Sequence, residues 1–361
     1  MRKISIKDID YISLGSTVLG TGGGGDPYVG KLLAKQAIKE HGEVTMISAE
    51  ELDDDAFVQP IAAFGSPMIM IEKLFTGDEF IKAFEMMESY QGRKIDAVMP
   101  AEAGGMNGVI PFAIAAEKNI PLVDADGMGR AFPRLEMVTF SLHGISASPI
   151  TQADEKGNKN VYDTINNEWG ETFLGATVVQ MGGICAIAPF PMTGSQVKKA
   201  AVLGTVSYAQ TLGAAILDAK KEKRNPLISL IEQAKAIELF GGKISNVSIN
   251  TEGRWSKGVC EIVGLGTYKG SDMILEFQNE FLMAKRDGLP IAMTPDLIVL
   301  LDAENAEPIT AETMQYGTRV IVIGMKCDDQ WRTPAGVELG GPQKFGYGET
   351  YSPIEHLNNK K

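Results

Sequence analysis

Apolar residues recur at helical spacing over the first 42 residues, on both sides of a run of glycines. The spacing predicts two helices, at residues 6–19 and 27–42. Ser5 and Asp8 form the sequence pattern of a capping box, which marks the start of the first helix. The glycine run at residues 20–25 therefore follows a helix and not a strand.

Short apolar runs alternate with amphipathic stretches over the next part of the chain. Such alternation is typical of a largely parallel sheet with helices on both faces, so we expect a three-layer α/β/α domain. Ligands of such sheets bind beyond the carboxyl ends of the strands. The predicted strands lie at residues 44–47, 58–64, 95–99 and 121–123, and the predicted helices at residues 78–90 and 109–118.

The pattern changes in the second half of the chain. Three further helices are predicted, at residues 172–182, 196–219 and 226–240. The stretch 243–345 contains short alternating runs punctuated by glycine and proline, which is typical of a β-sandwich or a β-barrel-like domain.

At 361 residues the chain is longer than one hydrophobic core supports, so more than one domain is expected. We expect an α/β domain at residues 1–170 that carries the glycine run. A helical segment at 171–242 completes or bridges its core. A β-rich domain at 243–347 follows, and a frayed tail at 348–361 ends the chain.

The composition is that of a soluble globular protein, with 44% hydrophobic and 22% charged residues. The net charge of -12 repels phosphate backbones and anionic membrane surfaces, so neither nucleic acid nor a membrane is expected as a partner. We find no signal peptide and no apolar run of the ~18 residues that a membrane helix needs, so a cytoplasmic location is expected. The cysteines are three in number and far apart, which disfavours a disulfide framework or a thiolate zinc site.

The glycine run predicts a place where another group approaches the backbone closely. Gly22, Gly23, Gly24 and Gly25 each cost roughly 0.5–1 kcal/mol relative to alanine in ordered structure, so a bare backbone is needed there. Asp26 is a predicted N-cap, and a helix that begins directly after it offers free N–H groups to a polar or anionic ligand. The alternative is a tight turn between two packed helices, in which Asp26 serves only as a cap.

The same run matches the dinucleotide-binding pattern, as Gly20-x-Gly22-x-x-Gly25. That pattern has its meaning only on a turn from a buried strand to a helix, and the residues before Gly20 predict a helix. A phosphate-binding Walker motif is also lacking from the sequence. We therefore expect no nucleotide cofactor.

Carboxylates follow two neighbouring strands of the predicted sheet. Glu102 follows one strand, and Asp124 and Asp126 follow the next; Asn107 lies in the same loop as Glu102. Neighbouring carboxylates raise one another's pKa, which suits general acid and base catalysis. They also suit a divalent metal ion such as Mg²⁺, whose presence the sequence leaves open. The alternative is that each carboxylate caps a loop or helix.

Two cationic or titratable side chains follow these strands. Arg130 is placed to bind a substrate carboxylate with two hydrogen bonds, or else to form a structural salt bridge. His143 is a candidate for proton transfer, or is a core histidine. Cys185 lies in a predicted core strand, without a basic neighbour that would activate it as a nucleophile.

Several segments together resemble the S-methyl thiohydantoin desulfurase family. The resemblance covers nearly the whole chain in the order of the family. Its segments are LGTGGGGDPY at residues 19–28, VDADGMGRAFP at 123–133, FQNEF at 277–281, PDL at 295–297 and WRTP at 331–334.

The resemblance implies an N-terminal three-layer α/β domain joined to a β-barrel-like C-terminal domain. The named activity of the family is the hydrolytic removal of methanethiol from an S-methylated thiohydantoin. Relatives are associated with hydantoinase and oxoprolinase genes, and members that act on other hydantoin-like or imide-like compounds are expected.

We therefore expect a homo-oligomeric metabolic hydrolase that acts on a small five-membered cyclic amide or isothiourea. Water attacks the carbon between two ring nitrogens, Asp124 or Asp126 is the base, and Glu102 or His143 assists the leaving group. The glycine run, Asp26, Asn107 and Arg130 bind the substrate. The alternative is a non-catalytic partner of a hydantoinase-type enzyme, which predicts a large exposed apolar patch instead of a polar pocket between domains.

Overall fold

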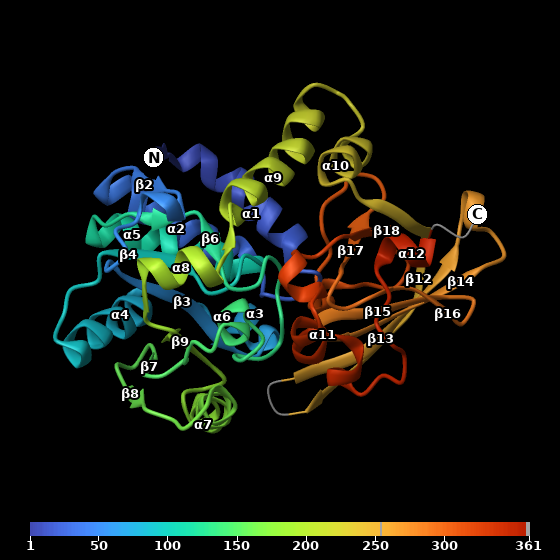
Figure 1. Ribbon diagram of the computed structural model, residues 1–361. Helices are drawn as coiled ribbons and strands as arrows, with labels where there is room; N and C mark the ends of the chain where they lie inside the picture. The colour runs from blue at the N-terminus through green and yellow to red at the C-terminus, as the bar shows by residue number, and fades with distance from the viewer. Residues whose placement is uncertain (253–254, 359–361) are drawn as a thin grey trace.

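The computed structural model of the chain describes residues 1–252 and 255–358. An N-terminal domain, drawn in blue to green, lies beside a C-terminal domain, drawn in orange and red (Figure 1). The first contains a mixed sheet between layers of helices, and the second a curled antiparallel sheet. The predicted fold class is therefore confirmed. Within the described residues, no helix combines the length and the apolar character needed to cross a membrane.

The sheet of the N-terminal domain is parallel in its centre, where β2, β5, β4 and β3 lie side by side. Antiparallel strands extend it at both edges, with β1 on one side and β9, β7 and β8 on the other. The order across the sheet is β1 (Arg2–Ile4), β2 (Val44–Ile47), β5 (Leu122–Val123), β4 (Ala97–Pro100), β3 (Phe57–Gly65), β9 (Ile184–Ala188), β7 (Ile150–Ala153) and β8 (Lys159–Tyr162), and β10 (Met192–Thr193) pairs with β3.

Helices cover both faces of this sheet, and each face has its own apolar cluster. Successive side chains of a strand point to opposite faces, so Val98 of β4 packs in one cluster and Met99 in the other. Phe84 and Phe112 belong to the first cluster, and Phe140 to the second. The helices of this domain are α1 (Ile6–Leu19), α2 (Pro27–His41), α3 (Pro67–Glu72), α4 (Asp78–Gln91), α5 (Ile110–Lys118), α6 (Thr139–Leu142), α7 (Asn167–Gln180), α8 (Gly194–Ala200) and α9 (Thr205–Lys221).

The predicted helix starts are confirmed at the beginning of the chain. Ser5 and Asp8 form the capping box of α1, whose last residue precedes the glycine run. Asp26 caps α2, and Pro27 is its first residue. The glycine run thus joins two helices, and the strand that a dinucleotide-binding turn requires is replaced by α1.

Two predicted helices are interrupted because strand pairing overrides the local apolar spacing. Residues 196–219 form α8 and α9 with β11 (Val202–Leu203) between them, and β11 pairs with β6 (Ala125–Asp126). The helix predicted at residues 226–240 ends early, as α10 (Pro226–Ala234). The chain then enters β12, which pairs with β13 and β18.

The C-terminal sheet is antiparallel throughout its described strands. Register shifts between β12 and β13, and between β14 and β15, mark β-bulges, which increase strand twist and so help to curl the sheet into a half-barrel. The strand order is β16 (Leu289–Met293), β15 (Glu280–Arg286), β14 (Asp272–Gln278), β13 (Trp255–Gly264), β12 (Ile237–Glu252), β18 (Arg319–Met325) and β17 (Leu297–Asp302).

The two domains share part of their apolar core. Val299 of β17 and Ile323 of β18 belong to the same cluster as Phe140 of the N-terminal domain. Trp331 is completely buried in this cluster, and its indole N–H donates to the Met128 carbonyl oxygen at 2.7 Å. A continuous core across the junction fixes the position of anything that lies between the domains.

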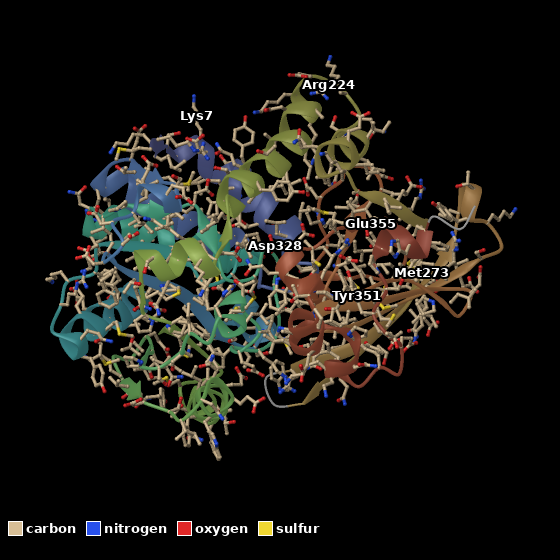
Figure 2. The ribbon with its side chains drawn as sticks, viewed as in Figure 1. Lys7, Arg224, Met273, Asp328, Tyr351 and Glu355 are labelled. Carbon is tan, nitrogen blue, oxygen red and sulfur yellow. The ribbon has the colours of Figure 1, made fainter. Side chains whose placement is uncertain are left out.

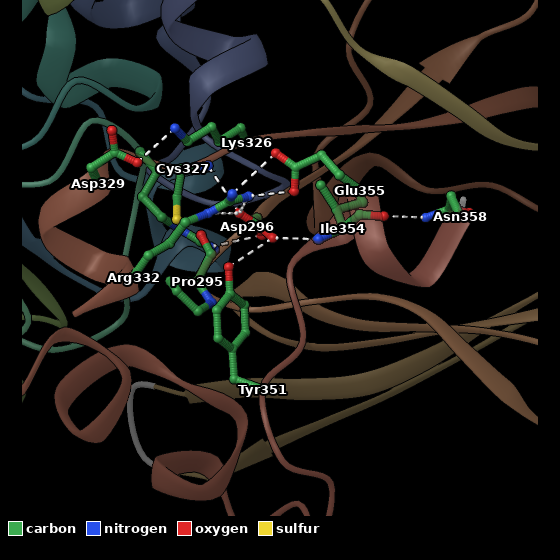
Figure 3. A network of polar contacts seen from close by, with 11 residues as sticks. Pro295, Asp296, Lys326, Cys327, Asp329, Arg332, Tyr351, Ile354, Glu355 and Asn358 are labelled. Atoms are coloured by element: carbon green, nitrogen blue, oxygen red, sulfur yellow. Dashed lines mark hydrogen bonds and ion pairs between the residues drawn. The ribbon is translucent and has the colours of Figure 1, made fainter. Parts of the chain in front are cut away.

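The tail predicted to fray is ordered through residue 358. It contains α12 (Ile354–Asn358), which follows α11 (Pro334–Gly340), and Figure 2 shows Tyr351 and Glu355 lying over the C-terminal domain. Asp296 accepts hydrogen bonds from the Tyr351 hydroxyl (3.0 Å) and the Ile354 N–H (2.9 Å), as Figure 3 shows. These bonds to a buried carboxylate are why the tail is held. Residues 359–361 of the predicted tail lie outside the described residues.

Candidate functional site

The segments that carry the family resemblance converge at the junction of the domains. Arg130 is completely buried there, and its Nη1 donates to the carbonyl oxygens of Pro295 (2.5 Å) and Asp296 (3.1 Å). Its Nη2 donates to Thr21 Oγ1 at 3.1 Å. The Phe281 N–H donates to the Thr21 carbonyl oxygen at 2.7 Å. The guanidinium thus links Thr21 to residues 295–296, and Thr21 in turn holds Phe281.

The glycine run is needed because other parts of the chain touch it. A Cβ on Gly23 would lie 2.0 Å from Glu280 Oε1, and one on Gly24 would lie 2.7 Å from the Gly104 backbone. Gly24 also has a positive φ of 77°, which favours glycine. Protein groups therefore make the close approach that the sequence predicted, and the loop is one of the contacts between the domains.

A cavity of about 80 Å³ lies between the two domains, beyond the carboxyl ends of β3 and β4. This is the edge of the sheet at which the sequence predicted a ligand. Both domains contribute to its wall, and most of its lining is apolar. Polar or backbone lining comes from Gly24, Gly25, Glu102, Asn107, Arg134, Asn279 and Glu280.

Glu102 lies in the wall of this cavity, and one of its two carboxyl oxygens accepts a hydrogen bond from the protein. The Asn107 side chain donates to Glu102 Oε1 at 2.5 Å, and is itself fixed because its Oδ1 accepts from the Ala63 N–H at 2.6 Å. Glu102 Oε2 is buried and has no hydrogen-bond partner among the described residues. Burial raises the pKa of Glu102 to about 8, while Asn107 acts in the opposite direction. Glu102 is therefore largely protonated at neutral pH.

Glu280 lines the same cavity from the C-terminal domain, as the first residue of β15. It is 3% exposed, and its Oε2 has no hydrogen-bond partner in the described part of the chain. Burial and the charge of Glu102 raise the pKa of Glu280 well above its ordinary value, whereas Arg130 lowers it. The two glutamates therefore titrate as an interacting pair.

Glu280 was not among the predicted site residues. It lies in the FQNEF segment that contributed to the family resemblance, so an acidic residue between two phenylalanines was the available signal. Its proximity to Glu102 depends on how the two domains meet. Nothing in the spacing of the sequence indicates that arrangement.

The predicted carboxylates Asp124 and Asp126 do not line the cavity. Asp124 accepts hydrogen bonds from the backbone N–H (2.9 Å) and the hydroxyl of Ser207, in the first turn of α9. Asp126 is completely buried and accepts from the N–H groups of Ala103 (2.6 Å) and Met128 (2.9 Å), among others. Both match the alternative in which a carboxylate caps a loop or a helix.

Arg130, His143 and Asp26 also lie outside the cavity lining. The donor groups of Arg130 are used within the protein, in hydrogen bonds to carbonyl oxygens and to Thr21 rather than in the salt bridge considered as the alternative. His143 is exposed rather than part of the core, and its Nε2 lies 2.9 Å from Gln330 Oε1. Asp26 is exposed and accepts from the Tyr28 N–H at 2.8 Å as a helix cap.

The described residues contain no cluster of three or more His, Cys, Asp or Glu side chains with the arrangement of a metal site. Glu102 and Glu280 are the carboxyl groups of the cavity lining. Cys185 is buried in β9, as predicted, and burial raises the pKa of its thiol to about 12. A thiol in this state is a poor nucleophile.

Known proteins resemble this chain over most of its length. Residues 7–164 match the family model described as S-Me-THD-like, N-terminal domain, and residues 165–354 match the S-Me-THD-like, C-terminal domain. The chain also resembles the crystal structure of a protein from Chromobacterium violaceum, a Northeast Structural Genomics Consortium target. The TM-score is 0.83 at 23% identity, over 98% of this chain and 100% of that chain, so the two share a fold. A search of curated proteins gave no match.

Proposed function

The chain belongs to the S-Me-THD-like family, and from this premise we propose that it is a hydrolase of a small five-membered cyclic amide or isothiourea. The family predicted from the sequence segments is thereby confirmed. An S-methyl thiohydantoin or a hydantoin-like compound is the proposed substrate. Such a ring carries N–H, C=N or C=O groups around its edge and an apolar face, which suits a mostly apolar cavity with a few polar groups.

The observation that carries the proposal is the pair Glu102 and Glu280. They come from different domains, line one cavity, and each has a buried oxygen without a partner among the described residues. A buried polar atom left unpaired costs about 1–3 kcal/mol, and a ligand that bonds to it offsets this cost. The raised pKa of both groups allows one to hold a proton while the other accepts one.

In the proposed reaction, water attacks the sp² carbon between the two ring nitrogens. One glutamate of the pair, in its ionised form, accepts a proton from this water as the C–O bond forms. The other glutamate donates its proton to the sulfur as the C–S bond breaks, so methanethiol leaves; the second water proton passes to the ring nitrogen, and a ring carbonyl remains. Transfer of one proton between the two glutamates restores the pair. With a hydantoin, the same groups would serve cleavage of a ring C–N bond.

The proposal is tested with the purified protein and a panel of S-methyl thiohydantoins and hydantoins, with and without a chelator. Thiol release and ring opening are measured separately. Glu102→Gln and Glu280→Gln are each expected to lower kcat by roughly 10²–10⁴-fold, because each removes one proton-transfer group.

The matched control is Glu79→Gln. Glu79 is also a buried glutamate, but it lies in α4 and its oxygens accept hydrogen bonds from Thr76. This variant is expected to retain wild-type turnover. Wild-type turnover in both cavity variants would contradict the assigned residues, and an inactive wild-type protein would contradict the hydrolase itself.

A second candidate is a ligand-binding partner of a hydantoinase- or oxoprolinase-type enzyme. The side chains of Ile165, Trp169 and Phe173, in and before α7, are 87%, 45% and 46% exposed. Exposed apolar groups gathered in this way are typical of protein contact surfaces. This candidate predicts that the panel compounds bind without turnover. Turnover of any one of them by the purified chain would favour the hydrolase.

A further inference from the structure

Arg134 lies in the wall of the cavity that the proposed function uses. Among the described residues, it is the cationic side chain of that wall. Its side chain is 40% exposed, whereas Arg130 is completely buried and its donors are bound within the protein. Arg134 is therefore the guanidinium that a bound ligand can reach from the cavity.

The charge of Arg134 is not matched by a close ion pair. Its Nη1 lies 3.9 Å from Glu136 Oε1, which is beyond hydrogen-bond distance. Its Nε is buried and has no hydrogen-bond partner in the described residues. Burial raises the pKa of Glu136, while the charge of Arg134 lowers it. A donor that is buried and unpaired favours a ligand that supplies an acceptor.

The C-terminal domain helps to position this guanidinium. The ring of Trp255, at the start of β13, lies 5.6 Å from Arg134 Cζ. A guanidinium placed near an aromatic ring gains a cation–π attraction, and its N–H groups keep the fork geometry that matches a carboxylate. Arg134 is thus held between the domains with donor capacity that the protein leaves unused.

We propose that Arg134 selects ligands that carry a carboxylate on the side of the ring away from the reacting carbon. The inference rests on the proposed function, which places the ring between Glu102 and Glu280. Arg134 then takes the role that the sequence suggested for Arg130. Because the chain has a net charge of -12, an anionic ligand needs such a local positive group.

The test compares a hydantoin that carries a carboxymethyl group on its ring carbon with the same compound in which a carboxamide replaces the acid. Binding is measured by calorimetry, and ring opening is measured in parallel. The wild-type protein is expected to prefer the acid by about tenfold to a hundredfold, as for a hydrogen bond to a charged group. Arg134→Gln is expected to abolish most of this preference, and Arg134→Lys to restore part of it.

Arg224→Gln is the matched control, because Arg224 is an exposed arginine between α9 and α10 that does not belong to the cavity lining; Figure 2 labels it at the top of the view. It is expected to keep the wild-type preference for the acid. Equal binding of acid and amide by the wild type, or a preference that survives in Arg134→Gln, overturns the inference even if both compounds are hydrolysed. An Arg134-dependent preference without turnover supports the inference and refutes the hydrolase. Failure of the acid to bind the wild-type protein overturns the inference.

Discussion

Buried carboxylates near the domain junction occur in two different environments. Asp296 is completely buried and accepts from Arg332 Nη2 (2.6 Å), the Cys327 N–H (3.0 Å), the Tyr351 hydroxyl and the Ile354 N–H (Figure 3). Glu102 and Glu280 are almost as deeply buried, yet each keeps an oxygen without a partner in the described part of the chain. In the first environment the protein supplies hydrogen-bond donors to both carboxylate oxygens. In the second, one oxygen of each glutamate lacks a donor among the described residues.

The comparison teaches that burial of a carboxylate does not by itself mark a functional site. Asp126 resembles Asp296, because its oxygens accept from several backbone N–H groups and it lies outside the cavity lining. A carboxylate whose bonds are all made inside the protein stabilises the fold. A buried carboxylate oxygen that lacks a hydrogen-bond partner lowers the stability of the protein. Such an oxygen is expected at a binding site, where a ligand supplies the missing hydrogen bond.

The largest expected effect on stability comes from Asp296→Ala. The change leaves Arg332 without its buried partner and removes the acceptor that binds the C-terminal tail at Tyr351 and Ile354. Loss of one member of a buried ion pair costs about 3–5 kcal/mol. The free energy of unfolding from urea titrations measures the change.

Glu102→Gln is the control, because it compares the loss of a carboxylate in the second environment with the loss of Asp296 in the first. It also replaces a buried carboxyl group, but the glutamine oxygen can still accept the hydrogen bond from Asn107. We expect it to cost no more than about 1 kcal/mol, or to stabilise the protein. If the two variants were equally destabilised, the distinction between the two environments would be wrong.

Arg130→Met is expected to destabilise the protein somewhat less, by about 3 kcal/mol. The variant leaves the Pro295 carbonyl oxygen and Thr21 Oγ1 without a donor that now links the two domains. The same change removes the positive charge that lowers the pKa of Glu280. Urea unfolding measures the loss, and Arg224→Gln is the control on an exposed arginine. A variant as stable as the control would show that Arg130 does not hold the domains together.

The free energy of unfolding should depend on pH because burial raises the pKa of Glu102. Its pKa is raised from 4.5 to about 8 in the folded protein, so between these pH values the folded state holds a proton that the unfolded chain has released. The resulting contribution to stability is complete below pH 4.5 and is lost as the pH rises to about 8. The slope is at most about 1.4 kcal/mol per pH unit for one group.

Urea titrations at pH 5, 6, 7 and 8 measure this slope. Glu102→Gln cannot ionise, so its stability should vary less over this range than that of the wild type. Glu79→Gln is the control, since it alters a buried glutamate whose oxygens are hydrogen-bonded. Equal slopes in the wild type and Glu102→Gln would mean that Glu102 is ionised in the folded protein.

The parts of the fold that depend on local patterns were predictable from the sequence. The capping box at Ser5, the cap at Asp26 and the alternation of strands and helices all follow from nearby residues. Glu102 was predicted at the edge of the sheet where the glycine run binds a ligand, and it lines the cavity together with Gly24 and Gly25, whereas Gly22 and Gly23 lie outside the lining. The helix predicted at residues 226–240 was cut short because its end pairs with the distant strand β18.

Of the two glutamates of the cavity, only Glu102 was predictable, because Glu280 comes from the other domain. Glu280 reaches the cavity from the start of β15, whose position depends on the contact of Phe281 with the glycine run. That contact involves tertiary packing and leaves no periodic pattern in the sequence. The prediction that Asp124 and Asp126 line the site failed for a related reason. β5 ends at Val123, and Asp126 lies in β6, which belongs to a different sheet, so the two carboxylates have different surroundings.

The smallest expected effect is that of Asp124→Asn, which tests whether a hydrogen-bonded carboxylate at a strand end has any part in turnover. The amide oxygen can still accept from Ser207 in the first turn of α9, so the loss should be about 1 kcal/mol of stability, as for a helix cap. Turnover of whichever panel compound the wild type hydrolyses should remain unchanged, while Glu280→Gln loses it. A large fall in kcat for Asp124→Asn at unchanged stability would identify Asp124 as the catalytic base. The partly exposed carboxylate would then act on the substrate although it lies outside the cavity lining.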